Sequence, residues 1–175
     1  MDNKRHENYP AWIVIISNFV SLAIYAIGAF IIYKLGLIWL ALYLLYILFL
    51  EIRLLRKSCI YCYYYGKICA FGKGKISSLL FRRGNAQQFS EIKITWKDIL
   101  PDFLVSIIPL IIGIILLIIN FDLLLLFLLV LLLILSSFGN AKVRGSLACK
   151  YCKQRDLGCP AAQLFNKNQE NRVRS

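Results

Sequence analysis

The hydrophobic residues of this chain fall into four long segments with polar stretches between them. The segments cover residues 11–33, about 37–55, 103–119 and 123–138. At 1.5 Å per residue, a helix of about 20 residues crosses the roughly 30 Å hydrocarbon core of a bilayer. Most helices of soluble proteins keep a polar stripe, and none of the four segments has one, which argues against the alternative of buried helices in a soluble protein. The pattern predicts an all-α membrane protein with four transmembrane helices.

Very short connections join these segments in pairs. Only residues 34–36 separate the first two segments, and only residues 120–122 separate the last two. Links of this length force the joined helices to run antiparallel as hairpins. Gly36 is suited to ending a helix, and Asp122 is suited to capping the next one.

Each hairpin is followed by a cysteine triplet. The segments are "CIYCYYYGKIC" (59–69) and "CKYCKQRDLGC" (149–159), and both have the spacing C-x2-C-x6-C. Every cysteine of the second triplet lies ninety residues after its counterpart in the first. We interpret the chain as a tandem repeat, with repeat 1 over residues 1–98 and repeat 2 over residues 99–175. The last ten residues, "NKNQENRVRS", are predicted to form a disordered tail.

Composition and charge give the predicted orientation. The chain is 59% hydrophobic, against about half in soluble proteins, and carries a net charge of +12. Of its 21 Lys and Arg residues, Lys34 alone lies in a hairpin turn; the other twenty precede residue 11, lie within 51–102 or follow Phe138. The positive-inside rule places those three regions in the cytoplasm of a multi-pass cell-membrane protein, with both termini and both triplets on that side.

Six thiols on the cytosolic side predict a metal site. The cytosol keeps thiols reduced, which argues against structural disulfides. Zinc takes four ligands, and six cysteines fill the eight ligand positions of two zinc ions when two of them bridge. The candidate ligands are Cys59, Cys62, Cys69, Cys149, Cys152 and Cys159. Five basic residues lie near the cysteines: Lys57, Lys67, Lys150, Lys153 and Arg155. We expect them to offset the negative charge of the cluster and to lower the thiol pKa values. The alternative is that they are ordinary positive-inside residues.

The second triplet resembles half of the fungal two-zinc, six-cysteine binuclear cluster. In that family C-x2-C-x6-C occurs twice, with basic residues between the second and third cysteines, a feature that Lys153 and Arg155 match. Here residues 70–148, which include a hairpin, separate the two triplets. The resemblance covers the two triplets alone. It implies a two-zinc ligand set and no DNA recognition.

Two other readings of the thiols remain open. Cys159-Pro160 resembles the Cys-Pro end of ferredoxin motifs, and the tyrosines at 61 and 63–65 would shield an iron–sulfur cluster in a redox subunit. Free thiols, or C-x2-C pairs that exchange disulfides, would need no metal. The sequence therefore predicts a metal site shared by the two triplets, with structural zinc ahead of the redox alternatives.

The rest of the basic side suggests surface contacts. Residues 75–84, "KISSLLFRRG", place Ile76, Leu79 and Leu80 on one helical face next to arginines, as in a helix lying among anionic lipid head groups. The cysteine-rich face is also suited to a protein partner, whereas nucleic-acid binding is disfavoured because the positive-inside rule already explains the basic charge. The sequence has no Ser-His-Asp arrangement, Walker loop or dinucleotide fingerprint, and no acidic residue deep in a span, which argues against an enzyme and against a transporter.

Overall fold

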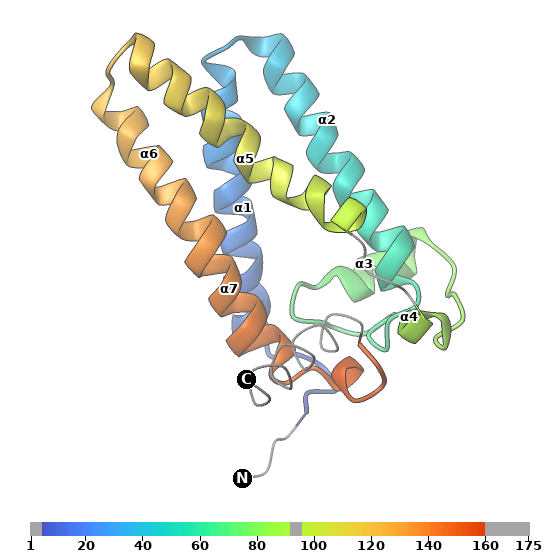
Figure 1. Cartoon of the computed structure of the whole chain (residues 1–175). Helices are drawn as coiled ribbons and strands as arrows, with labels where there is room; N and C mark the ends of the chain where they lie inside the picture. The colour runs from blue at the N-terminus through green and yellow to red at the C-terminus, as the bar shows by residue number, and fades with distance from the viewer. Residues whose placement is uncertain (1–4, 92–95, 160–175) are drawn as a thin grey trace, which may run out of the picture. The chain divides into compact units, whose positions relative to one another are not determined.

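The computed structural model describes residues 5–91 and 96–159 (Figure 1). Within them the chain is helical, and an isolated bridge between His6 and Cys152 is the sole β-type pairing. The chain divides into two compact units. The membrane unit comprises residues 16–53 and 96–144, and the cysteine unit comprises the described parts of residues 1–15, 54–95 and 145–175. The tail predicted to be disordered lies outside the described residues.

Four helical segments are long and apolar enough to cross a membrane, which confirms the predicted number. The first is α1, Ala11–Tyr33. The second is α2, Leu37–Leu54, which continues as the π-helix η1, Leu55–Cys59; the third is α5, Trp96–Ile119. The fourth is α6, Leu123–Ile134, continued by η2 (Leu135–Gly139), α7 (Asn140–Lys142) and η3 (Val143–Cys149).

The third and fourth helices are longer than the predicted spans. The third begins at Trp96 and the fourth continues to Cys149. No proline occurs in residues 110–159, and polar residues next to a span can stay helical where their side chains find partners. Arg144 donates from Nε to Asn140 Oδ1 at 2.9 Å, a bond between residues one helical turn apart.

The two hairpin turns lie at the same end of the membrane unit. Gly36 ends the first turn at a φ of 125°, a left-handed conformation that favours glycine. Asp122 caps α6 as predicted, because its Oδ1 accepts from Leu124 N at 3.0 Å. Lys34 Nζ lies 2.7 Å from Asp122 Oδ2, so an ion pair joins the two turns directly.

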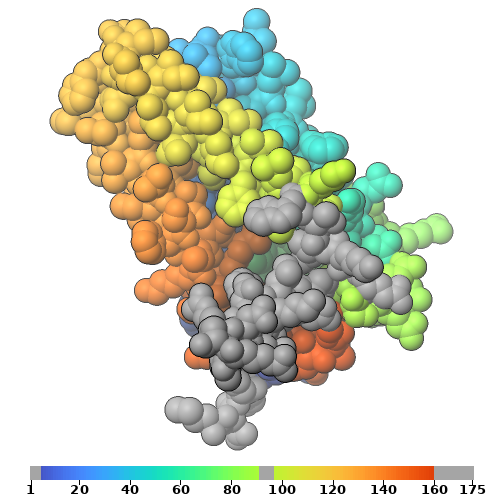
Figure 2. Space-filling view, viewed as in Figure 1, coloured from blue at the N-terminus to red at the C-terminus, as the bar shows by residue number. Residues whose placement is uncertain are grey.

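The main core of the membrane unit lies between α1 and α6. Isoleucines from α1 pack on leucines from α6: Ile24, Ile27, Ile31, Leu125, Leu129 and Leu132. Figure 2 shows the side chains of α6 (orange) closely packed beside those of α5 (yellow). Gly113 of α5 permits this, because a Cβ at that position would lie 2.6 Å from Leu129 Cδ2. Many large aliphatic and aromatic side chains of all four helices point outward, as lipid-facing surfaces require.

A proline in α5 is compensated by a tyrosine of α2. Pro109 has no N–H, so the carbonyl of Val105, four residues earlier, lacks its helical donor. The hydroxyl of Tyr43, itself buried, donates to Val105 O at 2.8 Å. Gly28 of α1 makes room for that hydroxyl, because a Cβ there would overlap it. The contacts among Gly28, Tyr43 and Val105 therefore connect α1, α2 and α5 inside the apolar region, where a carbonyl without a hydrogen-bond donor is energetically costly.

Further polar contacts tie α2 to its neighbours. Tyr25 of α1 donates from its hydroxyl to Glu51 Oε1 at 2.8 Å, and Arg53 pairs with Asp98 of α5 at 2.9 Å. Both acidic residues therefore have a partner on another helix.

The cysteine unit has little regular structure. It contains α3 (Lys73–Leu80), α4 (Gln88–Glu91) and the 3-10 turn η4 (Lys153–Arg155), together with η1 and most of η3. The helix predicted within residues 75–84 is present as α3. The core cluster of the cysteine unit consists of five buried residues, Tyr9, Ile13, Tyr64, Ala70 and Ala148.

Candidate functional site

All six cysteines lie in the cysteine unit, and the two triplets begin in the same way. Cys59 ends η1 and Cys149 ends η3, so each triplet starts where the helix of a membrane span ends. None of the six forms a disulfide. In both triplets the first cysteine is thus the last residue of the helical segment that forms the second part of a hairpin.

The backbone follows the same course through both triplets. Cys62 N donates to Cys59 O at 3.3 Å, and Cys152 N donates to Cys149 O at 3.4 Å. Two further bonds recur at the ninety-residue offset. In the first pair, Tyr65 N donates to Cys62 O and Arg155 N donates to Cys152 O. In the second pair, Lys67 N donates to Tyr64 O and Leu157 N donates to Gln154 O. Three equivalent hydrogen bonds make the C-x2-C turn and the residues after it locally alike.

The two triplets contact each other through a reciprocal pair of hydrogen bonds. Tyr63 N donates to Gln154 Oε1 at 2.6 Å, and Lys153 N donates to the Tyr64 hydroxyl at 3.0 Å. Tyr63 is equivalent to Lys153, and Tyr64 to Gln154. Each backbone N–H therefore donates to the side chain of the residue that follows its own equivalent position in the other triplet. Tyr64 and Gln154 are 2% and 4% exposed, so this contact is the buried centre of the pair.

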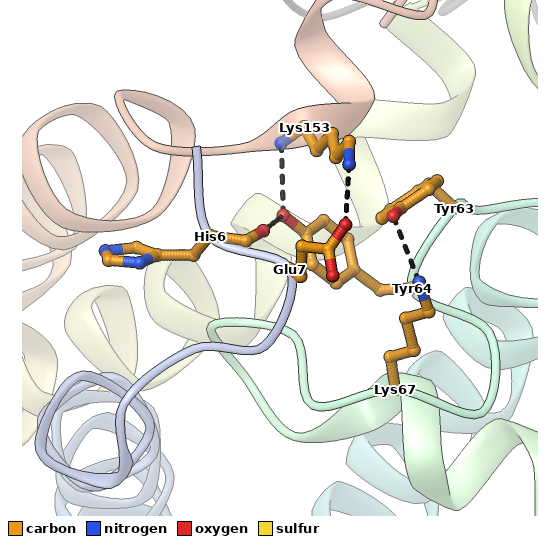
Figure 3. Close-up of polar contacts among 6 residues, drawn as sticks. All are labelled: His6, Glu7, Tyr63, Tyr64, Lys67 and Lys153. Carbon is orange, nitrogen blue, oxygen red and sulfur yellow. Dashed lines mark hydrogen bonds and ion pairs between the residues drawn. The ribbon is translucent and has the colours of Figure 1, made fainter. Parts of the chain in front are cut away.

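The N-terminal segment lies across both triplets. On the side of the second triplet, His6 N donates to Tyr151 O at 3.2 Å, and the Tyr9 hydroxyl donates to Ala148 O. On the side of the first triplet, Tyr9 N donates to Ile68 O at 2.9 Å. The Tyr64 hydroxyl, which accepts from Lys153, also donates to His6 O at 2.6 Å (Figure 3). A segment far away in the sequence therefore completes the contact between the triplets.

Charged residues line the edge of this contact. Lys153 Nζ lies 2.9 Å from Glu7 Oε1, and Lys67 Nζ donates to the Tyr63 hydroxyl at 3.0 Å (Figure 3). Both lysines also lie over the Tyr63 ring, at 4.3 Å for Lys67 and 5.2 Å for Lys153. Hydrogen bonds from Lys67 and Lys153 lower the pKa of Tyr63, and the bond to Lys153 lowers the pKa of Glu7. At the edge of the contact, Lys153 therefore pairs with the carboxylate of Glu7, and Lys67 donates to the hydroxyl of Tyr63.

The thiols at the centre have raised pKa values. Burial, together with a smaller effect of negative charge on Cys152, Cys59 and Cys69, raises the pKa of Cys62 to about 12. Burial also raises the pKa of Cys152. The expectation that basic residues lower these pKa values is wrong for Cys62 and Cys152, because burial outweighs every other influence there. In the absence of metal, both thiols are protonated at neutral pH.

Backbone N–H groups are directed at three of the sulfurs. The N–H of Tyr64 favours the thiolate of Cys62, and those of Gln154 and Arg155 favour the thiolate of Cys152. These are equivalent positions, because Tyr64 and Gln154 each follow their cysteine by two residues. Cys69 Sγ accepts from Gly74 N at 3.4 Å. Such donors support thiolates when a cation replaces the thiol protons.

The cysteines are brought into one unit without forming a closed ligand set. Among residues 5–91 and 96–159, no group of three or more His, Cys, Asp and Glu side chains lies close enough to hold a metal ion. The imidazole of His6 lies between aromatic rings, 5.3 Å from the centres of both Tyr9 and Tyr151. The donor chemistry suits zinc, and the sulfurs would have to approach one another to bind it.

Sequence reasoning missed the residues that join the triplets. Tyr64 had a predicted role only among the tyrosines that would shield an iron–sulfur cluster, and Gln154 and the segment from Arg5 to Tyr9 had none. The one available signal was the tyrosine run beside Cys62, since buried tyrosines usually find a hydrogen-bond partner for the hydroxyl. Comparisons with protein-family models, with curated proteins and with solved structures found no match to this chain.

Proposed function

We propose that this chain is a multi-pass cell-membrane protein whose cytoplasmic cysteine unit binds zinc and is held together by it. The ligands would be the six cysteines, Cys59, Cys62, Cys69, Cys149, Cys152 and Cys159, shared by two ions. The observation that carries the proposal is the matched turn at Cys62 and Cys152, with N–H donors at equivalent positions directed at both sulfurs. Paired turns of this kind are suited to present two thiolates each to a cation.

The mutual influence of the thiols supports a shared site. Negative charge on Cys152 raises the pKa of Cys62, so the two triplets lie within electrostatic reach of each other. Six thiolates in one small unit would repel one another strongly. Two divalent cations would remove that repulsion and replace the thiol protons.

The small core of the cysteine unit supports a structural role for the metal. Its core cluster has five buried residues, two of them alanines, and none of its short helices is stable alone. Units with so little buried apolar surface usually need disulfides or a metal. Free thiols in a reducing compartment leave the metal as the cross-link, worth on the order of ten kcal/mol.

We interpret the two halves as a duplicated unit of hairpin plus triplet. The ninety-residue offset recurs in the backbone bonds of the triplets and in the reciprocal Tyr63–Gln154 and Lys153–Tyr64 contacts. Reciprocal contacts between equivalent positions are what a pseudo-twofold axis produces. Such an axis places metal ligands from both repeats around one centre.

The proposed orientation follows from charge. Lys34 is the one basic residue in the hairpin turns, and it pairs with Asp122. The side that holds the turns therefore has almost no free positive charge, while twenty basic residues lie on the other side. The positive-inside rule then places the termini and the cysteine unit in the cytoplasm.

Metal analysis of the purified chain tests the proposal. We expect about two zinc ions per chain after anaerobic purification in detergent, and markedly less in Cys62→Ser and in Cys152→Ser, because each loss removes a ligand of the shared cluster. Ser58→Ala, in the same turn as Cys59, is the matched control and should keep the full metal content.

The outcomes separate the alternatives. Iron in place of zinc, with visible charge-transfer absorption, would favour an iron–sulfur cluster in a redox subunit over structural zinc. A chain with neither metal, whose thiols all react freely with a probe, would refute a metal role. Loss of metal in one variant but not in the other would show that one triplet alone binds the metal, which would refute a shared site.

A further inference from the structure

One face of α3 is fixed to the first triplet. Gly74 and Ser77 are buried, and a Cβ at position 74 would overlap the carbonyl oxygen of Tyr64. Gly66 N donates to Gly74 O at 3.0 Å, and Gly74 N donates to Cys69 Sγ at 3.4 Å. The helix therefore packs backbone to backbone against the loop that carries the cysteines.

The opposite face of α3 is apolar, and no side chain of residues 5–91 or 96–159 buries it. Ile76, Leu79 and Leu80 are 47%, 80% and 62% exposed. At about 100° per residue, these three side chains form one stripe, and Lys73 and Lys75 project on either side of it. Isolated exposed leucines are common on soluble proteins, but a stripe of three aliphatic residues bordered by lysines on both sides is typical of a helix lying in a membrane interface.

The charge around this stripe has a single sign. Residues 73–84 contain four basic residues, Lys73, Lys75, Arg82 and Arg83, and no acidic residue. Arg82 and Arg83 are exposed. A protein partner would have to supply a matching acidic rim, whereas anionic lipid supplies negative charge and an apolar interior together. The chain also has four helical segments long and apolar enough to cross a membrane, and α3 follows the end of η1 after only residues 60–72.

We propose that the outer face of α3 inserts into the head-group region of an anionic bilayer, with Ile76, Leu79 and Leu80 among the upper acyl chains and the four basic residues at the lipid phosphates. Since α3 is bound to the loop of Cys69, this contact would hold the first triplet at the membrane surface. The inference is independent of metal binding, because it concerns the face of α3 turned away from the cysteines.

Tryptophan quenching by brominated lipid tests this contact in the full chain. Leu79→Trp and, as matched control, Gln87→Trp, an exposed position of the same unit, are reconstituted in bilayers of phosphatidylcholine brominated near the top of its acyl chains, with and without phosphatidylglycerol. The unsubstituted chain gives the background from its three tryptophans. We expect strong additional quenching at position 79 and none at position 87.

A charge variant measures the electrostatic part. Replacing each of the four basic residues by Gln should lower the ratio of inserted to detached helix by about five-fold per residue in anionic bilayers, and should have little effect in pure phosphatidylcholine. Zinc content should stay unchanged in these variants.

Three results would overturn the proposal. Quenching at position 79 no greater than at position 87 would mean that the stripe does not reach lipid. Shielding of Leu79→Trp from acrylamide without quenching by bromolipid would indicate a protein partner or a second copy. Equal quenching with and without anionic lipid would exclude a role for the basic residues.

Discussion

Removing the Tyr64 hydroxyl should open the cysteine unit. This hydroxyl accepts from Lys153 N and donates to His6 O, and the side chain is 2% exposed. Tyr64→Phe leaves the part-buried N–H of Lys153 and the part-buried carbonyl of His6 without these partners while keeping the ring. Each hydrogen bond contributes about 1 kcal/mol net, and a buried group without a partner costs about 1–3 kcal/mol. The total loss should be about 2–4 kcal/mol.

Thiol labelling in the metal-free chain measures this loss. Cys62 and Cys152 are partly buried and protonated, so a maleimide reaches them mainly when the unit opens, and the labelling rate follows the opening equilibrium. A loss of 2 kcal/mol corresponds to about a 30-fold faster rate. Tyr63→Phe is the matched control, because its hydroxyl bonds Lys67 at the solvent-exposed edge and its loss should change the rate little.

The labelling rates of Tyr64→Phe and Tyr63→Phe together test whether the hydrogen bonds of the Tyr64 hydroxyl stabilise the contact between the triplets. If Tyr64→Phe labels no faster than Tyr63→Phe, the bonds to Lys153 and His6 do not hold the triplets together. The reciprocal contact would then be incidental to the stability of the cysteine unit.

Three further predictions concern pH and close packing. Burial raises the pKa of the Cys62 thiol to about 12. The contribution of this thiol to stability is therefore complete below the ordinary thiol pKa of about 8.5 and is lost as pH rises toward 12. The urea midpoint of the metal-free chain should fall over that range, and an equal fall in Cys62→Ser would exclude this thiol as the cause. Gly28→Ala should lower the thermal stability of the detergent-solubilised chain, because the new methyl group overlaps the Tyr43 hydroxyl, and an unchanged melting temperature would contradict this packing. Gly74→Ala should expose the thiols to labelling by displacing α3, whereas Gly145→Ala, which has nothing within 4 Å of its new Cβ, should not; equal labelling of the two would count against the packing of α3 on the triplet.

Much of the membrane unit could be predicted from the sequence, because bilayer thickness imposes a length on any apolar helix. The four spans, the tight turn at Gly36 and the cap at Asp122 depend on local residues, and the structure has them. Helix ends were less predictable. Residues 139–149 look like a polar linker, yet they remain helical to Cys149, because polarity alone does not end a helix and no proline intervenes.

In the cysteine unit, the sequence by itself determined the spacing of the thiols and their division into two equal triplets. Only the tertiary structure decided that Tyr64 meets Lys153, that Gln154 meets Tyr63, and that the segment around His6 lies across both triplets. These contacts join residues from about 60 to about 145 positions apart in the sequence. No local periodicity encodes them, since they arise when buried N–H and hydroxyl groups of distant segments must find partners away from water.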